Sequence, residues 1–241
     1  MRKIERLPLD DATLSRLRTL ADRVARSADP RTEAARLWGN LAQRTRESIR
    51  DTLAVMSGSR ERCMYCEDSQ GTDIDHFRPK SAYPEHTFSW PNHLLACARC
   101  NSNHKRDQFP LDEAGNPLLI DPTADDPTKH LSFSPTTGMY VGEDRKGATT
   151  IDVFALNRDV CTTGRRAVWV AMMELIRGYA LRKDAGDDAQ AADLLTALVN
   201  QPFQSLRVYI GTVCRGGSAE LLLPADVISA IARYPELIAD T

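Results

Sequence analysis

Two C-x-x-C pairs, Cys63 with Cys66 and Cys97 with Cys100, contain four of the six cysteines and are separated by 30 residues. Each pair places two thiolates on one side of a tight turn, and two pairs supply the four soft ligands that tetrahedral zinc prefers. A complete set of four thiolates leaves no open position for a substrate. The alternatives are a redox dithiol and a coincidence of free thiols, which two pairs disfavour. The spacing therefore predicts a structural Zn²⁺ site.

Asp75 and His76 stand side by side between the cysteine pairs, and two asparagines follow at Asn92 and Asn101. Neighbouring side chains on a strand point to opposite faces, but at a strand end bent by Pro79 both can reach one phosphate. Asp75 could then hold a hard divalent cation, Mg²⁺ or Mn²⁺. His76, with an ordinary pKa of about 6.5, could take a proton from water at neutral pH. Asn101 would complete this site from the start of the next helix.

Two other classes of zinc protein need to be weighed. A zinc deaminase requires H-x-E upstream of P-C-x-x-C, but the sequence has no H-x-E, and Ala96 precedes Cys97. A non-catalytic zinc module that binds DNA or protein would explain the four cysteines equally well. It would not explain the order in which Asp75, His76 and the asparagines occur, so it ranks second.

In content and order these residues resemble the HNH endonuclease family, whose ββα-metal element is often braced by two C-x-x-C pairs. The resemblance places Asp75 and His76 on the first strand, Asn92 on the second and Asn101 on the helix. It implies metal ligation by Asp75 and Asn101, a general base at His76 and a loop braced by Asn92. Histidine is frequent in the family at the position of Asn101, so His104 or a water could share the coordination. The implied reaction is metal-dependent hydrolysis of nucleic-acid phosphodiesters, with DNA favoured over RNA and with 5′-phosphate and 3′-hydroxyl products.

A wider set of short motifs resembles the HNH components of Septu-type anti-phage systems. This resemblance implies a bacterial defence nuclease that works with a partner ATPase. The motifs are the opening Met1-Arg-Lys-Ile-Glu5, Cys63-x-Tyr-Cys-Glu67, Phe77-Arg-Pro-Lys-Ser81, Phe88-x-Trp90, Cys100-Asn-x-x-His-Lys105 and Ile120-Asp-Pro122.

Basic residues are the candidates for contact with a nucleic acid. Near the predicted site, Arg78, Lys80, Lys105 and Arg106 could neutralise phosphates or could be solvated loop charges. The net charge is −2, yet residues 1–62 hold 14 lysines and arginines against 9 aspartates and glutamates. Such a basic segment could hold a phosphate backbone or a partner, although a solvated helix face is the commoner use of this charge.

Apolar periodicity predicts helices on both sides of the cysteine-rich segment. One helix begins near Asp10 and Asp11, and a second runs from Thr32 to Met56 and ends at the break Ser57-Gly58-Ser59. Beyond residue 160 the helical period returns, with Trp169, Met172 and Met173 expected in the core, and a last helix opens at Pro224. Between 111 and 150, turn pairs separate short apolar pieces such as Leu118-Leu119-Ile120, which predicts loops with brief strands.

The composition, with 241 residues, 42% hydrophobic and 27% charged, is that of a globular protein. We expect no membrane span, no secretory signal and a cytoplasmic location. The expected fold is α+β and mostly helical, with a small zinc-braced ββα core. Cys161 and Cys214 are expected to be ordinary buried thiols, and His86, His93 and His130 structural or surface residues. Four regions are expected: an N-terminal helical arm at 1–62, the HNH nuclease core at 63–110, a loop-rich connection at 111–160 and a C-terminal helical region at 161–241.

Overall fold

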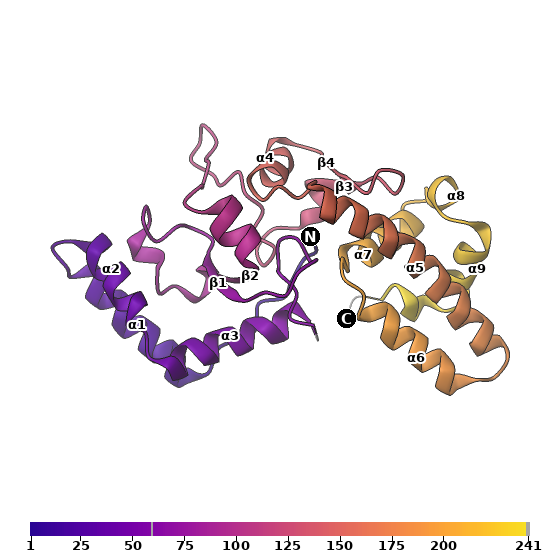
Figure 1. The fold of residues 1–241 in the computed structure, drawn as a ribbon, viewed down its shortest axis with the longest axis horizontal. Helices are drawn as coiled ribbons and strands as arrows, with labels where there is room; N and C mark the ends of the chain where they lie inside the picture. The colour runs from indigo at the N-terminus through magenta and orange to yellow at the C-terminus, as the bar shows by residue number, and fades with distance from the viewer. Residues whose placement is uncertain (59, 240–241) are drawn as a thin grey trace.

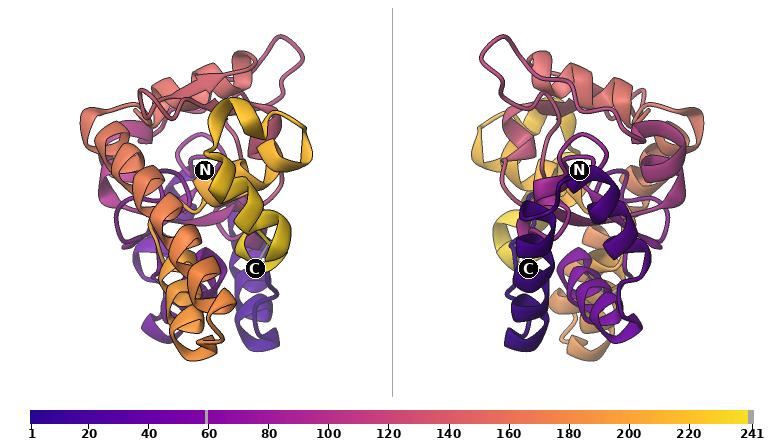
Figure 2. Two further views of the ribbon diagram at one scale, coloured as in Figure 1. Left: turned by 90° about the vertical axis from the view of Figure 1, so that its right-hand side faces the viewer. Right: turned by 90° about the vertical axis from the view of Figure 1, so that its left-hand side faces the viewer.

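The computed structural model describes residues 1–58 and 60–239, and it is α+β and mostly helical (Figure 1). Ser59, part of the predicted helix break, and residues 240–241, at the end of the predicted C-terminal region, lie outside the described residues. Two groups of helices reach toward the same side of the molecule, away from α4 (Arg145–Val153) and the hairpin of β3 (Leu131–Phe133) and β4 (Tyr140–Gly142) (Figures 1 and 2). The small sheet of β1 (Asp73–His76) and β2 (His93–Ala96) lies over α3 (Gln43–Ser57).

Three helices form the N-terminal group: α1 (Asp11–Ala25), α2 (Pro30–Gly39) and α3 (Gln43–Ser57). The predicted start of α1 is confirmed, because the Asp10 side chain accepts a hydrogen bond from the main-chain nitrogen of Thr13. The single helix predicted from Thr32 to Met56 is wrong. The chain breaks after Gly39, where Asn40 donates to the main-chain oxygen of Arg36 at 2.8 Å. The break lets α2 pack on α1 while α3 packs on β2.

The cysteine-rich segment forms an antiparallel hairpin followed by a short helix. Strand β1 (Asp73–His76) pairs with β2 (His93–Ala96), so that Asp73 lies opposite Ala96 and His76 opposite His93. A π-helix of residues Arg99–Lys105 follows β2 and carries Asn101. The strand–strand–helix order is therefore present. Asn92 was expected on the second strand, but it ends the 3₁₀ turn Trp90–Asn92 just before that strand.

The segment from 111 to 160 contains more regular structure than expected. Strands β3 (Leu131–Phe133) and β4 (Tyr140–Gly142) form a hairpin, and helix α4 (Arg145–Val153) follows it. The Asp144 side chain caps α4 by accepting from Gly147. The predicted brief strand Leu118–Ile120 is instead an irregular buried segment, whose Ile120 nitrogen donates to the Thr150 hydroxyl of α4 at 2.9 Å. Helix α4 has only nine residues, fewer than the window of about 11–18 residues over which an apolar period is recognised in a sequence.

The C-terminal group consists of α5 (Asp159–Asp184), α6 (Asp188–Val199), α7 (Ser205–Arg215), α8 (Ala219–Leu222) and α9 (Ala225–Arg233). The predicted apolar face of α5 is confirmed: Trp169, Met172 and Met173 are all buried. The predicted start of the last helix is also confirmed, because Pro224 is the cap residue of α9. Figure 2 shows α5 and α6 side by side, in agreement with their extensive contacts.

Buried apolar residues from all four expected regions meet in one hydrophobic core. The first ten residues take part, since Arg6 donates to the main-chain oxygens of His93 at 2.7 Å and Pro91 at 3.0 Å. The Trp90 indole nitrogen in turn donates to the oxygen of Leu7. No helix in residues 1–58 and 60–239 has both the length and the apolar character needed to cross a membrane.

Candidate functional site

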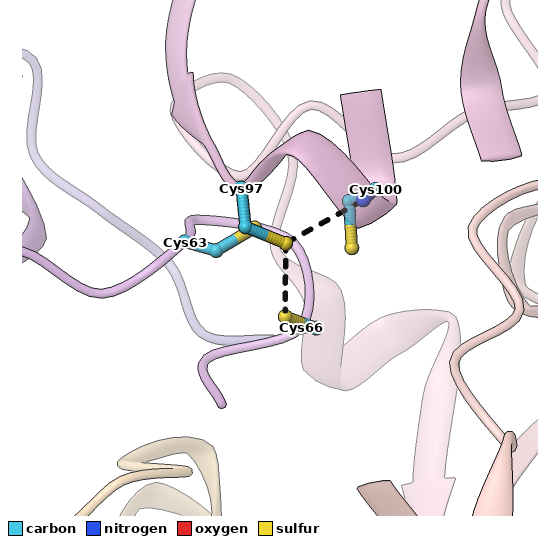
Figure 3. Close-up of side chains that lie close together, drawn as sticks. All are labelled: Cys63, Cys66, Cys97 and Cys100. Atoms are coloured by element: carbon cyan, nitrogen blue, oxygen red, sulfur yellow. Dashed lines mark hydrogen bonds between the residues drawn. The ribbon is translucent and has the colours of Figure 1, made fainter. Parts of the chain in front are cut away.

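The two C-x-x-C turns are brought together by the β1–β2 hairpin. Cys97 follows β2 directly, and the first turn docks on the same strand because the Met64 nitrogen donates to the Leu95 oxygen at 2.9 Å. All four cysteines are buried, and their Sγ atoms lie within 4.8 Å of one another (Figure 3). Zn–S bonds of about 2.3 Å in a tetrahedron separate the sulfurs by about 3.8 Å. The Sγ atoms of Cys66 and Cys97 are 3.8 Å apart, so this cluster could hold zinc.

The surroundings of the cluster also suit a bound cation. Burial raises the pKa of the Cys63 thiol, so a metal ion would release protons when it binds. Arg158 lies beside the cluster, where burial lowers its pKa but the thiols of Cys161 and Cys66 outweigh that effect and raise it. A positive charge at Arg158 would offset the excess negative charge of four thiolates around one Zn²⁺. Cys161 is buried, as expected, whereas Cys214 is only half-buried.

Asp75 faces the π-helix and is held by two side chains. Its Oδ1 atom accepts from Lys105 Nζ at 3.0 Å, and its Oδ2 atom accepts from the Tyr65 hydroxyl at 2.6 Å. Lys105 is completely buried and also donates to the main-chain oxygen of His76 at 2.6 Å. Tyr65 stacks on Phe154, with 3.9 Å between ring centroids. This buried network joins the first cysteine turn, β1, the π-helix and α4.

His76 lies on the opposite face of β1 from Asp75, as the alternation of a strand requires. Its Nε2 atom is 3.1 Å from the main-chain oxygen of Thr87, and Nε2 of His93 is 2.9 Å from the same oxygen. A carbonyl oxygen only accepts, so both Nε2 atoms carry a proton, and Nδ1 is the unprotonated nitrogen of a neutral His76 ring. The ring packs edge-on against Trp38 of α2, with centroids 4.3 Å apart.

Burial keeps both imidazoles neutral. Burial lowers the pKa of His76 well below its usual value, and His93, when it is protonated, and the charge of Lys80 act in the same direction. Burial likewise lowers the pKa of His93 to about 4. His93, expected to be structural or on the surface, is fully buried, while His130 pairs with Asp144 at 2.6 Å. A neutral His76 has the protonation state that a general base needs.

The two asparagines make different contacts from each other. Asn92 clamps the loop after β1: its Oδ1 accepts from the Arg78 nitrogen at 2.7 Å, and its Nδ2 donates to the oxygens of Arg78 and His86. Asn101 donates to Asp73 Oδ2 at 3.1 Å, and not to Asp75. The side chain of His104 faces Arg158 and Arg99, whose charges add to burial in lowering its pKa.

The expected hard-cation site is not assembled in this structure. Both Asp75 oxygens are bonded to other side chains, and Asn101 is engaged with Asp73. In residues 1–58 and 60–239, the four cysteines are the only group of three or more His, Cys, Asp or Glu residues close enough to share an ion. The residues therefore do not fit a divalent cation at Asp75, because a cation there would have to displace the buried Lys105 ammonium.

The four basic candidates divide into buried and exposed residues. The prediction that Lys105 contacts phosphates is wrong, because its side chain is fully buried against Asp75. Lys80 and Arg106 are exposed, and Arg78 is half-buried with its guanidinium over the rings of Tyr83 and Phe109. Three cationic side chains thus remain near the loop after β1.

Sequence reasoning missed several residues that shape the site: Trp38, Tyr65, Asp73 and the main-chain oxygen of Thr87. The sequence did contain one signal for the contacts with β1. Asn101 and Lys105 are four positions apart on one helix, so both side chains lie on the face that is turned toward Asp73 and Asp75. The contact between Trp38 and His76 had no local signal, because it depends on how α2 docks.

The chain is therefore an α+β protein with a strand–strand–helix unit, next to which four buried cysteines could hold a zinc ion. No protein-family model matches the chain. The chain is similar to the Septu protein PtuB of Bacillus mycoides strain KBAB4, with 34% identity over 152 residues, or 51% of each protein. It is also similar to the Septu protein PtuB of Bacillus thuringiensis, with 35% identity over 114 residues, or 44% of this chain and 40% of that one.

A shorter match is to protein ea31 of Escherichia phage lambda, which is 39% identical over 64 residues, or 26% of this chain and 21% of the phage protein. The chain spans about half the length of the first PtuB relative and less of the other two. The resemblance to Septu components is thereby confirmed over about half of the chain.

Proposed function

We propose that the chain is the nuclease of an anti-phage defence system and that His76 is the general base of phosphodiester hydrolysis. The observation that carries the proposal is the shared Thr87 oxygen, which fixes the Nε2–H form of His76 and leaves Nδ1 as a proton acceptor. The similarity to Septu PtuB proteins supports the defence role. Its substrate would be a nucleic acid, with DNA favoured over RNA.

In the proposed reaction, His76 Nδ1 takes a proton from a water molecule that attacks the phosphorus atom. Negative charge grows on the phosphate oxygens as the new bond forms, and nearby cationic side chains stabilise it. Arg78 and Lys80 follow His76 within four residues and are the nearest candidates along the chain. Asn92 keeps their loop in position through the bonds to Arg78.

The test is a nicking assay on supercoiled plasmid, repeated with structured RNA, using the purified full chain and its His76→Ala variant. His86→Ala is the matched control, because His86 is half-exposed in the loop after β1 and its ring makes only a long 3.8 Å contact with Glu85 and a 6.4 Å ring contact with Tyr83. We expect His76→Ala to lose cleavage while it stays folded and keeps its zinc content, although the cavity left by the buried ring lowers its melting temperature. We expect His86→Ala to cut normally. Cleavage by His76→Ala at the wild-type rate would refute the role of His76.

The same assay tests two further parts of the proposal. Arms with Mg²⁺, with Mn²⁺ and with a chelator of hard cations measure the metal dependence that the HNH resemblance implies. Arms with and without an ATPase from the same defence locus measure the dependence on the partner that the Septu resemblance implies. Because the residues around Asp75 do not fit a divalent cation, we expect equal nicking rates with Mg²⁺, with Mn²⁺ and with the chelator. We expect faster nicking in the arm that contains the ATPase.

The second candidate is a non-catalytic zinc module that binds DNA or protein. It is favoured by one observation: Asp75 and His76 are both almost fully buried, which suits a structural role. If the wild-type chain binds DNA but cuts neither DNA nor RNA in any arm, this second function is the correct one.

A further inference from the structure

His76 is covered by a segment from a distant part of the sequence. Its side chain is only 6% exposed, although the strand that carries it lies at the edge of a two-stranded sheet. The covering group is the Trp38 ring, which lies 4.3 Å from the His76 ring, 5.2 Å from His93 and 6.0 Å from Phe88. A water or a phosphodiester could not reach His76 through the volume that this ring fills.

The helix that carries Trp38 is a small element with its own boundaries. Helix α2 has ten residues and is bounded by Asp29 and Asn40, whose side chains bond to α2 itself. It packs on α1 and on the 3₁₀ turn Pro84–His86 in the loop between β1 and β2. Ala34 and Leu37 of α2 are buried and Trp38 is partly buried, so the helix is held in place by these few apolar side chains.

A single arginine of the next helix holds Trp38 from the solvent side. Arg46 of α3 donates to the Trp38 main-chain oxygen at 2.8 Å, and its guanidinium lies 5.1 Å from the centre of the indole ring. Trp38 is thus held by one hydrogen bond and one cation–π contact in addition to its packing on neighbouring rings. An element held in this way can open locally without unfolding the protein.

We propose that α2 is an autoinhibitory cover, in which Trp38 closes the approach to His76 until α2 moves away. This inference rests on the proposed function, because it assigns regulation to the proposed base. The cover explains why the Thr87 oxygen fixes the tautomer of His76 although the same ring is shielded from water. Opening would uncover His76 and His93 together, since the Trp38 ring contacts both.

Diethyl pyrocarbonate, which acylates accessible neutral imidazoles, tests the cover without relying on nuclease activity. The full-length wild type is compared with Trp38→Ala, and Trp38→Phe is the matched control that keeps an aromatic ring over His76. Peptide mass spectrometry gives the rates for His76, for the half-exposed His86 and, as an internal reference away from α2, for His130. If the cover is closed in about nine molecules of ten, Trp38→Ala should speed His76 modification by about tenfold. The rate at His130 should not change, and Trp38→Phe should behave like the wild type.

Three outcomes overturn the cover. The first is a His76 rate equal to that of His86 in the wild type, and the second is a His76 rate that Trp38→Ala leaves unchanged. The third is faster modification of His76 without faster plasmid nicking in a chain whose wild type nicks. If neither the wild type nor Trp38→Ala nicks plasmid, the proposed nuclease function fails. The acylation rates of His76 still show in that case whether Trp38 covers the ring.

Hydrogen exchange on the wild type provides a measurement that does not depend on the folding of any variant. Amides of α2 should exchange through local opening, at rates insensitive to low denaturant, whereas β1 and β2 should exchange only on global unfolding. Exchange of α2 only together with β1 would overturn the proposal.

Discussion

Lys105 Nζ lies 3.0 Å from Oδ1 of Asp75, and both side chains are almost completely out of contact with solvent. The lysine was expected to meet phosphates or to be a solvated loop charge, and the aspartate to hold a divalent cation, but the two side chains pair with each other. The same ammonium bonds to the His76 oxygen, so it ties the π-helix to the end of β1. A buried ion pair costs desolvation energy and is stable only when its hydrogen bonds are complete, as they are here for both Asp75 oxygens.

Breaking this pair should destabilise the protein strongly. We expect Lys105→Met to lower the free energy of unfolding by about 3–5 kcal/mol, because it leaves the Asp75 carboxylate buried and unpaired. The double variant Asp75→Asn with Lys105→Met should recover part of the loss. Urea unfolding measures both, and Lys80→Met, at an exposed site in the same region, is the control. A loss below about 1 kcal/mol for Lys105→Met would contradict a stabilising ion pair between Lys105 and Asp75.

Removing one cysteine of the cluster should remove the metal. We expect Cys97→Ser to lower the zinc content well below that of the wild type and to expose residues 63–110 to hydrogen exchange, because three thiolates and a hydroxyl make a weaker zinc site. Elemental analysis and exchange by mass spectrometry measure the two effects. Cys214→Ser, outside the cluster and half-buried, should change neither. Equal zinc content in Cys97→Ser and wild type would rule out a four-cysteine site.

Stability should fall as the pH is lowered from 7 toward 5. Burial holds the pKa of His93 at about 4 in the folded chain, against about 6.5 when unfolded, so the unfolded state binds more protons below pH 6.5. This histidine alone should therefore lower the free energy of unfolding by about 1.4 kcal/mol at pH 5.5 relative to pH 7.5. His76, whose pKa burial also lowers, adds to the fall.

Urea unfolding of the zinc-loaded protein at pH 7.5 and 5.5 measures this effect. His93→Gln keeps a donor for the Thr87 oxygen but does not titrate, so its stability should depend less steeply on pH than that of the wild type. His86→Gln, at a half-exposed site, should show the wild-type slope. Identical slopes for His93→Gln and wild type would mean that His93 binds protons equally in the folded and unfolded states, which contradicts a lowered pKa in the folded protein.

The spacing of residues along the sequence was enough to predict several features of this protein. Two residues between paired cysteines are enough to set the geometry of a metal-binding turn, and the structure places the four sulfurs together. The apolar period of α5 predicted its buried face, since that period reflects the turn of the helix itself. The similarity to Septu proteins could also be recognised from short motifs.

Tertiary packing decided which partner each polar side chain of the site has. Asp75 pairs with a lysine thirty residues away in the π-helix, and Asn101 turns to Asp73. His76 lies beneath Trp38, whose helix is separate from α3 only because the chain breaks after Gly39. Residue types and spacing restrict local geometry to a few choices, but contacts across tens of residues depend on how whole elements dock. For that reason the cluster of four cysteines was predictable from the sequence, whereas the burial of His76, the proposed base, was not.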